Sequence, residues 1–374
     1  MSKYTYIICG KLYNGIDAEF KEGYKILVKD NKIEAVGREI PQPETAEVVD
    51  LSDATVTPGM IDAHMHMDYI DWHTIREEVY TTSEEAKTIA IIRTAQKTLS
   101  RGFTTVRHPG GITSNGFGVL DVKRAIEKGY ITGSRIVAAP RFLCAAGSHG
   151  DLSQGFARNP ELSNIVQNLR LSLGAGKDFF VNAVREEIKY GADFIKIMTT
   201  GILDFNEHGA ITGTPLDGSE VKEMVHIAHE EGMAVMSHTN GDYGVQAAVA
   251  AGVDSLEHGN YMNEESLAML AESDTVWVPT LVTVRNLLGD GRYDDETLKP
   301  IIESAEENIR KAFRLGIKTA PGSDAGAYRV LHGKGIRDEV QSFAEILGDQ
   351  DAAYRWLAEG EAEIKKKFTV TVHW

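Results

Sequence analysis

The feature that most constrains the fold is an alternation of short apolar runs with amphipathic stretches, which begins near residue 58. The apolar runs fit eight strands, namely Gly59–His66, Thr104–Arg107, Arg135–Ala139, Phe194–Met198, Ala234–His238, Ser255–His258, Val276–Thr280 and Lys318–Ser323. Strands that alternate with helices predict a parallel sheet, and eight strands close into a TIM-like (β/α)8 barrel. A doubly wound open sheet is the alternative, although no G-x-G-x-x-G pattern follows an early strand.

The amphipathic stretches between these runs fit helices, and several are followed by glycine, which commonly ends a helix. They are Ser83–Arg101, Val119–Lys128, Lys177–Tyr190, Ser219–Glu231, Tyr243–Ala251, Glu264–Ala271 and Asp295–Leu315. A long stretch rich in Gly, Ser and Asn, Arg141–Gly176, follows the third expected strand. A connection of that length is typical of a lid or a pocket wall.

The first 57 residues carry strand signals only: strands at Tyr4–Cys9 and Val48–Val56, and a hairpin of Tyr24–Val28 and Lys32–Val36 around the turn pair Asp30-Asn31. We therefore expect residues 1–57 to supply most of a small β-sandwich-like domain. Residues 58–335 should form the barrel. Residues 336–374 read as charged helices followed by a strand, Thr369–Trp374, that can return to the β domain.

Composition narrows the class of protein. The chain has 39 Lys and Arg against 55 Asp and Glu, a net charge of −16, so nucleic acid and anionic membranes are poor partners. There is no run of about 18 apolar residues and no signal-peptide pattern at the N-terminus. The two cysteines, Cys9 and Cys144, have no metal-binding spacing. We expect a cytoplasmic protein that acts on a small molecule.

Four histidines fall at the C-terminal ends of expected strands, where barrel enzymes place their chemistry. His64 and His66 are two residues apart, so a strand directs both side chains to one face. His238 and His258 end the fifth and sixth strands. Two imidazoles on one rigid strand can chelate a divalent metal, and a pair of buried, hydrogen-bonded histidines is the alternative.

Two further groups belong to the same rim. Lys196 lies in an apolar strand, where a charged ammonium is costly unless it is paired. It can react with carbon dioxide to form a metal-bridging carbamate, and a snorkelling lysine or a buried ion pair is the alternative. Asp324 follows the eighth strand, where a carboxylate can bind metal and accept a proton from water, or cap a helix. Because all these side chains face one rim, we expect a metal site.

Several motifs resemble those of the amidohydrolase superfamily, over roughly Tyr4 to Gly335. The most specific is P-G-M-I-D-A-H-M-H at Pro58–His66, and the others are Gly102–Arg107, Gly191–Met198, Ser237–Gly241, Ala251–Gly259 and Gly322–Gly326. Within that superfamily the chain is most similar to the branch of imidazolonepropionases and prolidase-like Xaa-Xaa dipeptidases. Imidazolonepropionases lack the bridging lysine and use one metal, so Lys196 favours the dipeptidase side.

The resemblance implies two divalent metal ions, with zinc expected, although manganese, iron and cobalt suit the same donors. The implied ligands are His64, His66 and Asp324 for the more buried metal, His238 and His258 for the second, and carbamylated Lys196 with a hydroxide as the bridge. Asp324 would also be catalytic, taking the hydroxide proton and passing it to the leaving amine.

The resemblance also implies substrate contacts. His149 matches a position that prolidase-like relatives use to hold the substrate near its carbonyl, which makes it a second catalytic candidate. Relatives often have tyrosine where Asn240 stands, so Asn240 and Tyr243 are candidates for orienting the carbonyl. Arg107 can bind a substrate carboxylate or form a structural salt bridge. His108 stands where many relatives have aspartate.

We therefore expect a metal-dependent amidohydrolase that cleaves the amide bond of a small substrate with a free carboxylate, such as a dipeptide, an Xaa-Pro-like compound or an N-acyl amino acid. A hydrolase of cyclic amides of the lactam or imidazolone type, or a deaminase, is the alternative that the departures at His108 and Asn240 suggest. A degenerate barrel that serves as a binding protein is a third, which the complete ligand set disfavours. A homo-oligomer is expected, as is common for such barrels.

Overall fold

The computed structural model describes residues 3–15, 19–69, 82–111, 117–151, 153, 158–168 and 173–368. The chain divides into two units, residues 1–60 and 61–374. Among the residues described, no helix is both long enough and apolar enough to cross a membrane.

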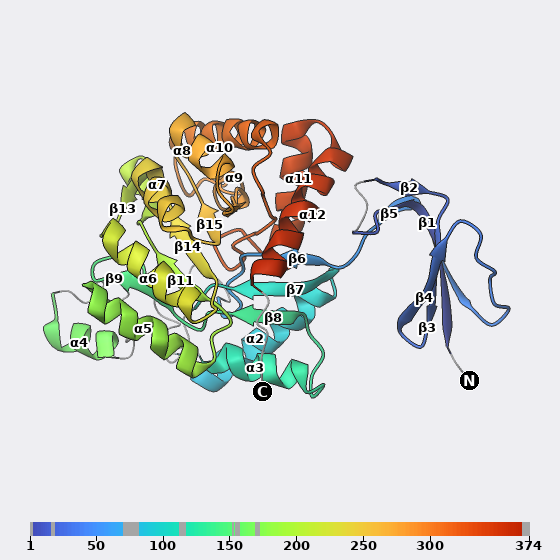
Figure 1. The fold of residues 1–374 in the computed structure, drawn as a ribbon, viewed down its shortest axis with the longest axis horizontal. Helices are drawn as coiled ribbons and strands as arrows, with labels where there is room; N and C mark the ends of the chain where they lie inside the picture. Colours follow the sequence, from blue (N-terminus) through green and yellow to red (C-terminus); the bar gives the residue numbers. More distant parts are fainter. Residues whose placement is uncertain are drawn as a thin grey trace. The chain divides into compact units, whose positions relative to one another are not determined.

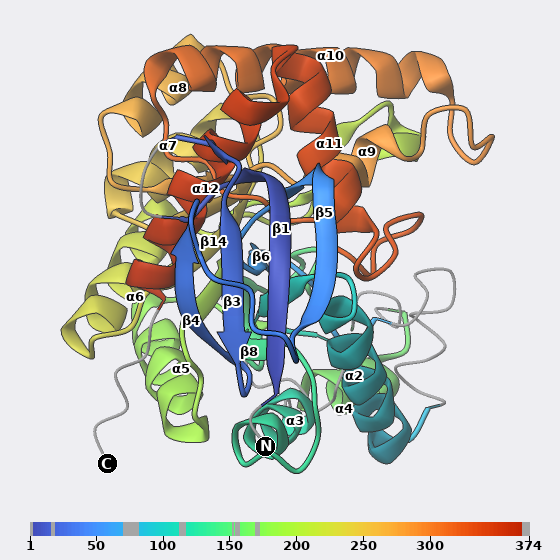
Figure 2. The same ribbon diagram turned by 90° about the vertical axis from the view of Figure 1, so that its right-hand side faces the viewer.

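The first unit is a five-stranded sheet, seen in blue in Figure 2. Its strands are β1 (Tyr4–Leu12), β2 (Lys21–Glu22), β3 (Lys25–Lys29), β4 (Lys32–Gly37) and β5 (Glu47–Val56). β1 pairs antiparallel with β2 and β3 and parallel with β5. Asp30 and Asn31, between β3 and β4, have φ of 47° and 66°, which is the backbone of a hairpin turn of type I′.

The described part of this unit is therefore one sheet, and the sandwich-like arrangement predicted from the sequence is not present in it. β1 pairs with β2, β3 and β5, and β4 pairs with β3, so hydrogen bonds join all five strands in one sheet. The strand predicted at Thr369–Trp374, which would have joined this domain, lies outside the described residues.

The second unit contains two parallel sheets. The larger has the strand order β10 (Leu173–Gly174), β9 (Phe142–Ala145), β11 (Ile195–Met198), β14 (Val235–Thr239), β15 (Ser255–His258) and β16 (Val276–Val278). The smaller has the order β6 (Met60–Asp62), β7 (Phe103–His108) and β8 (Arg135–Ala138). The predicted alternation of parallel strands with helices is thus confirmed, and the fold is mixed α/β.

Helices cover these sheets (Figure 1). They are α2 (Glu84–Leu99), α3 (Phe117–Glu127), α4 (Pro160–Asn168), α5 (Lys177–Tyr190), α6 (Gly218–Glu230), α7 (Gly241–Ala251), α8 (Glu264–Ala271), α9 (Val282–Arg285), α10 (Asp295–Leu315), α11 (Gly335–Leu347) and α12 (Gln350–Lys367). Several end at the glycine that the sequence indicates. Gly191, after α5, has a φ of 95°, a left-handed conformation that costs glycine little.

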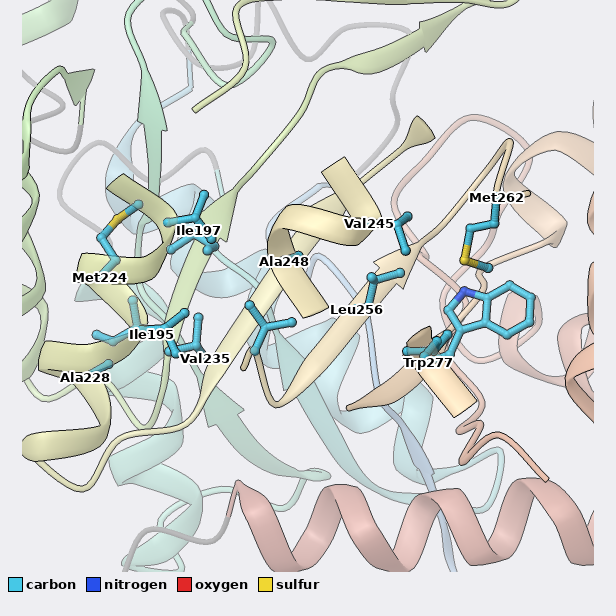
Figure 3. Packing of buried hydrophobic residues seen from close by; sticks show 14 of the residues in the cluster. Ile195, Ile197, Met224, Ala228, Val235, Val245, Ala248, Leu256, Met262 and Trp277 are labelled. Atoms are coloured by element: carbon cyan, nitrogen blue, oxygen red, sulfur yellow. The ribbon is translucent and has the colours of Figure 1, made fainter. Parts of the chain in front are cut away.

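Apolar side chains gather on one face of β11, where they pack against α6 (Figure 3). Ile195 and Ile197 of β11 belong to the cluster that includes Met224 and Ala228 of α6. Because side chains alternate in a strand, Lys196 points to the opposite face of the sheet. The helices therefore cover one face of β11, and the other face carries the lysine.

Hydrogen bonds link the two sheets on both sides. On one side the Asp193 N–H, just before β11, donates to the Ala138 carbonyl of β8 at 2.8 Å. On the other side Thr319 forms a bridge with Trp277, and Ala63 N donates to the Pro321 carbonyl at 2.9 Å. The predicted eighth strand, Lys318–Ser323, is not a regular strand, because Pro321 has no N–H to continue a ladder.

Some elements were not predicted. The long connection after β8 contains β9, α4 and β10, and a short hairpin of β12 (Ile202–Asp204) and β13 (Ala210–Thr212) follows β11. The charged helices predicted within residues 336–374 are, by contrast, present as α11 and α12, which belong to the same unit as the parallel sheets.

Candidate metal centre

Three of the predicted ligands form one cluster. The ligand atoms of His64, His66 and Asp324 all lie within 4.8 Å of one another. Asp324 Oδ1 is 3.5 Å from His64 Nε2 and 3.4 Å from His66 Nε2. The Asp324 backbone N–H donates to the His64 carbonyl at 2.7 Å, which ties the loop after the Thr319 bridge to the end of β6. Two imidazole nitrogens and a carboxylate are a donor set that suits zinc and similar divalent ions.

Hydrogen bonds decide which ring nitrogen each of these histidines offers. His64 Nδ1 lies 2.7 Å from Glu257 Oε2, and His66 Nδ1 lies 2.6 Å from the Gly110 carbonyl. Carboxylates and carbonyls only accept, so each Nδ1 carries the hydrogen. The lone pair is then on Nε2 in both rings, the atom that faces Asp324.

His238 and His258 continue the row of imidazoles. The ring centroids of His64 and His258 are 5.0 Å apart, and those of His258 and His238 are 4.5 Å apart. His238 Nε2 donates to the Gly201 carbonyl at 2.9 Å, so its lone pair is on Nδ1. His258 Nδ1 bonds to Thr280 Oγ1 at 2.6 Å, which leaves its Nε2 for another partner.

Backbone conformation marks the ends of two ligand-bearing segments. His258 and Asp324 have φ of 68° and 56°, in the left-handed region that side-chain-bearing residues rarely adopt. At the end of β15 this conformation interrupts the strand alternation. Strained backbone of this kind clusters at functional sites, where the surrounding structure holds it.

Lys196 is a buried lysine that lies among these groups. Its side chain is 1% exposed, and Nζ has no hydrogen-bond partner among the described residues. Burial lowers the pKa of Lys196 to about 8, against the raising effects of Glu257 and Asp324. The lowered pKa increases the fraction of neutral amine near neutral pH, and a reaction of this nitrogen with an electrophile requires the neutral form.

The electrostatics of the cluster favour uncharged rings. Burial, together with the positive charge of Lys196, lowers the pKa values of His64, His238 and His258 well below the ordinary histidine value. Burial raises the pKa of Asp324 to about 8, although Lys196 opposes this rise. A bound cation would reverse the effect on Asp324, because positive charge favours the ionised carboxylate.

His149 also lies in the cluster. Its ring centroid is 4.3 Å from that of His238, and its Nδ1 is buried without a partner in the part of the chain that the structure describes. Burial lowers its pKa to about 3. Asp151 holds this loop by accepting the N–H of Gly147 at 2.9 Å. A neutral imidazole with one unused nitrogen is suited to contact a polar ligand atom.

The other three predicted substrate contacts have different surroundings. Arg107 is fully buried and forms a salt bridge with Glu257 at 2.8 Å, the second of the two alternatives that the sequence left open. Asn240 donates to the Gly201 carbonyl at 3.0 Å and accepts from Asn260 Nδ2 at 2.9 Å, so both ends of its amide contact protein. Tyr243 lies on α7 and is 59% exposed.

Two buried carboxylates that sequence reasoning did not select support the ligands. Asp62 accepts from Ser323 N at 3.0 Å and Ser323 Oγ at 2.6 Å, which fixes the segment before Asp324. Glu257 orients His64. Both lie inside motifs used in the sequence analysis, and an acidic residue within an apolar strand was the available signal.

His108 and His332 lie next to His66. His108 Nδ1 accepts from the Met67 N–H at 3.1 Å, so its hydrogen is on Nε2, which has no partner among the described residues. His332 Nε2 lies 2.8 Å from the His66 carbonyl. His332 therefore supports the backbone that carries His66.

Comparisons with known proteins show the family of the chain. The model of the amidohydrolase family matches residues 55–347. Ochratoxinase of Aspergillus niger is 28% identical over 346 residues, which cover 86% of this chain and 69% of that protein. The crystal structure of a Xaa-Pro dipeptidase with bound methionine is 28% identical, with a TM-score of 0.77 over 98% of this chain and 89% of that one. The crystal structure of A. niger ochratoxinase has a TM-score of 0.79 at 23% identity, over 98% of this chain and 84% of that one.

The chain therefore belongs to the amidohydrolase family, because the family match covers most of its length and includes the whole metal cluster. It is a hydrolase that acts on C–N bonds, in the prolidase-like branch that the motifs indicate. The superfamily is generally metal-dependent, and the ligand set described above fits that property.

Proposed function

We propose that this protein is a metal-dependent amidohydrolase that cleaves the amide bond of a small substrate with a free carboxylate, such as a dipeptide, an Xaa-Pro-like compound or an N-acyl amino acid. One observation carries the metal part of the proposal. In His64, His66 and His238, one ring nitrogen donates to an oxygen acceptor, which leaves a lone pair on the other. Histidines held in this way are typical metal ligands.

The substrate class rests on the relatives. The Xaa-Pro dipeptidase that this chain resembles acts, by its name, on a dipeptide bond, and ochratoxinase acts on ochratoxin. His149 supports a substrate contact in this chain, since its buried Nδ1 is unused and its ring lies beside His238. We propose that His149 holds the substrate near its carbonyl group.

We propose that two divalent ions, zinc in the first instance, occupy the centre. His64, His66 and Asp324 would hold the first ion, and His238 and His258 the second. Lys196 would bridge them as a carbamate. Ions at such a site polarise a carbonyl and lower the pKa of bound water.

The carbamate forms when the neutral Lys196 amine attacks carbon dioxide. A nitrogen–carbon bond forms, one C=O bond of carbon dioxide becomes a carboxylate, and one proton leaves the nitrogen. The unpaired, buried Nζ supports this step, because the bare lysine has no partner among the described residues. The product is an anion that two cations would compensate.

In the hydrolysis, Asp324 would take a proton from the attacking water and pass it to the departing nitrogen. The water oxygen bonds to the carbonyl carbon, the C–N bond breaks, and the products are a carboxylic acid and an amine. Asp62 contributes indirectly, because its bonds to Ser323 hold the segment that carries Asp324.

We also propose that the two parallel sheets close into one (β/α)8 barrel. The hydrogen bonds from Asp193 N to the Ala138 carbonyl and from Ala63 N to the Pro321 carbonyl, with the bridge between Trp277 and Thr319, support this closure. A closed barrel would bring the C-terminal ends of β6, β11, β14 and β15 to one rim, which is where the proposed ligands lie.

Metal counting is the first test. Elemental analysis of protein produced with added zinc and bicarbonate should find about two metals per chain, with fewer in Lys196→Ala, because the bridge is lost. One metal in both proteins would make Lys196 structural and would favour the single-metal alternative, a hydrolase of cyclic amides or a deaminase. No metal in either would contradict the proposal.

Activity is the second test. Asp324→Asn and Lys196→Ala should each lower turnover by roughly 10³-fold or more, because both remove groups that act in the reaction. The substrates to screen are dipeptides, Xaa-Pro dipeptides and N-acyl amino acids, with lactams and amino-heterocycles beside them. Circular dichroism checks that each variant is folded. Near-normal turnover in either folded variant would refute the assigned role.

A further inference from the structure

A chain of buried polar groups lies behind His64. Glu257 Oε2 accepts from His64 Nδ1 at 2.7 Å, and Glu257 Oε1 accepts from Arg107 Nη2 at 2.8 Å and from Ser255 Oγ at 2.6 Å. Arg107 also donates through Nη1 to Ser255 Oγ at 2.8 Å and through Nε to the Ala63 carbonyl at 2.6 Å. Each of these polar residues is at most 1% exposed.

The groups around Glu257 require an acceptor at this place. His64, Arg107 and Ser255 all donate to it, and both carboxylate oxygens are used. A charge-assisted bond of this length fixes both the hydrogen and the plane of the His64 ring. Arg107 in turn compensates the buried charge of Glu257, which would be costly without a partner.

The end of α12 covers the other side of Arg107. The guanidinium carbon of Arg107 is 4.3 Å from the ring centroid of Phe368, and Phe368 is 3% exposed. Phe194 packs edge-on against Phe368, with ring centroids 5.3 Å apart. Phe368 and Ile364 share a core cluster with Ile61 of β6, so α12 lies against the sheet that carries His64 (Figure 1).

We propose that Glu257 is a positioning residue for His64, that Arg107 and Phe368 hold Glu257 in place, and that the end of α12 thereby supports the metal centre. The inference rests on the proposed function, since it takes His64 as a metal ligand. Its consequence is that a helix more than 280 residues after His64 in the sequence contributes to metal affinity.

Zinc affinity tests the role of Glu257. The full-length chain is stripped of metal, and its zinc dissociation constant is measured by competition with a coloured chelator. Glu257→Gln should weaken zinc binding by about 10- to 100-fold, the usual effect of losing the carboxylate behind a ligating histidine. The matched control is Glu339→Gln, because Glu339 is also fully buried and accepts the N–H groups of Leu281 and Val282 at 3.0 and 2.9 Å. The control should keep the zinc affinity of the wild type.

Phe368→Leu tests the link to α12 without removing a polar group, so it keeps the inference testable if Glu257→Gln does not fold. It should weaken zinc binding by roughly fivefold, the size of a lost buried cation–π contact. Phe343→Leu is its control, since Phe343 is a fully buried ring of α11 that packs against Trp356. Phe343→Leu should leave zinc affinity unchanged while both variants lose stability.

The absorption spectrum of bound cobalt gives a second readout, because it reports the geometry of the ligands. It should change in Glu257→Gln and Phe368→Leu and stay constant in the two controls. Unchanged affinity and spectrum in folded Glu257→Gln and Phe368→Leu would overturn this inference and leave the proposed function standing. A wild-type chain that binds no zinc would overturn the proposed function itself.

Discussion

At the scale of single residues, the ligand atom of each histidine depends on a neighbour that is distant in the sequence. The lone pair of His64 is on Nε2 because its Nδ1 donates to Glu257. The lone pair of His238 is on Nδ1 because its Nε2 donates to the Gly201 carbonyl. The motifs identify these histidines as candidates. They cannot tell which nitrogen is free, because that depends on hydrogen bonds that form only in the folded chain.

Gly201 provides a sharp test at this scale. A Cβ at Gly201 would lie 1.7 Å from the Thr212 carbonyl oxygen, so Gly201→Ala must move either the β12–β13 hairpin or the carbonyl that holds His238. We expect the free energy of unfolding to fall by about 1–3 kcal/mol, the usual cost of such overpacking. Urea denaturation measures this loss, and zinc titration should show weaker binding.

Gly218→Ala is the matched control, because a Cβ there would meet nothing closer than 3.9 Å, at Ala247. Gly218 begins α6, where alanine suits the helix at least as well as glycine. Its unfolding free energy should therefore change by no more than about 0.5 kcal/mol. Equal losses in the two variants would show that the close approach at Gly201 has no consequence.

At the scale of elements, one carboxylate joins three segments. Asp254, just before β15, accepts from His229 of α6 at 2.8 Å and from the Val235 N–H of β14 at 2.8 Å, and it lies 3.4 Å from Lys367 of α12. The hydrogen bond to Asp254 raises the pKa of His229, although partial burial opposes this rise. The packing of α6 on the sheet should therefore depend on pH.

The sign of this dependence follows from linkage. A raised histidine pKa in the folded state stabilises the fold at low pH, and this stabilisation is lost as the pH rises from the ordinary value of 6.5 through the raised pKa. His229→Gln should thus destabilise the protein more at pH 6 than at pH 9. We expect less than about 1 kcal/mol, because the side chain is partly exposed.

Urea denaturation at the two pH values measures this difference. His226→Gln is the control for loss of a histidine from the same helix, since His226 lies 3.6 Å from Glu230 on the helix surface. A loss of stability in His229→Gln that is equal at both pH values would contradict the role of the Asp254 bond.

At the scale of the whole molecule, a metal centre of this kind should couple folding to metal binding. The proposed ligands come from strands and loops between residues 64 and 324, and the unfolded chain does not hold them together. Zinc at about 100 times its Kd should therefore stabilise the folded protein by about 2.7 kcal/mol. Calorimetry with added zinc and with a chelator measures the change as a shift of Tm.

His66→Ala is the control for this prediction, because it removes one ligand from the cluster with Asp324. Its Tm should respond much less to zinc than that of the wild type. An equal response in both proteins would mean that the stabilising zinc binds elsewhere.

Much of the fold follows from local pattern. The strand Ser255–His258 was predicted at its observed bounds, and the turn at Asp30 and Asn31 was recognised from its residues. The β9 strand was missed, because its short apolar run lies within a stretch dominated by turn-forming residues. The Lys318–Ser323 segment was over-predicted, because isolated bridges replace a ladder around Pro321.

The sequence by itself determined the alternation of strands and helices, the family, and the identity of the candidate ligands, because periodicity and motif spacing are local properties of the chain. The tertiary structure alone decided that Arg107 joins Glu257 behind His64, that Asn240 is occupied by protein contacts, and that Phe368 reaches the same network. Which residues become hydrogen-bond or packing partners depends on how the strands pack against one another in the folded chain. Burial then makes each unpaired polar group costly, so such a group must find a partner that sequence distance does not reveal.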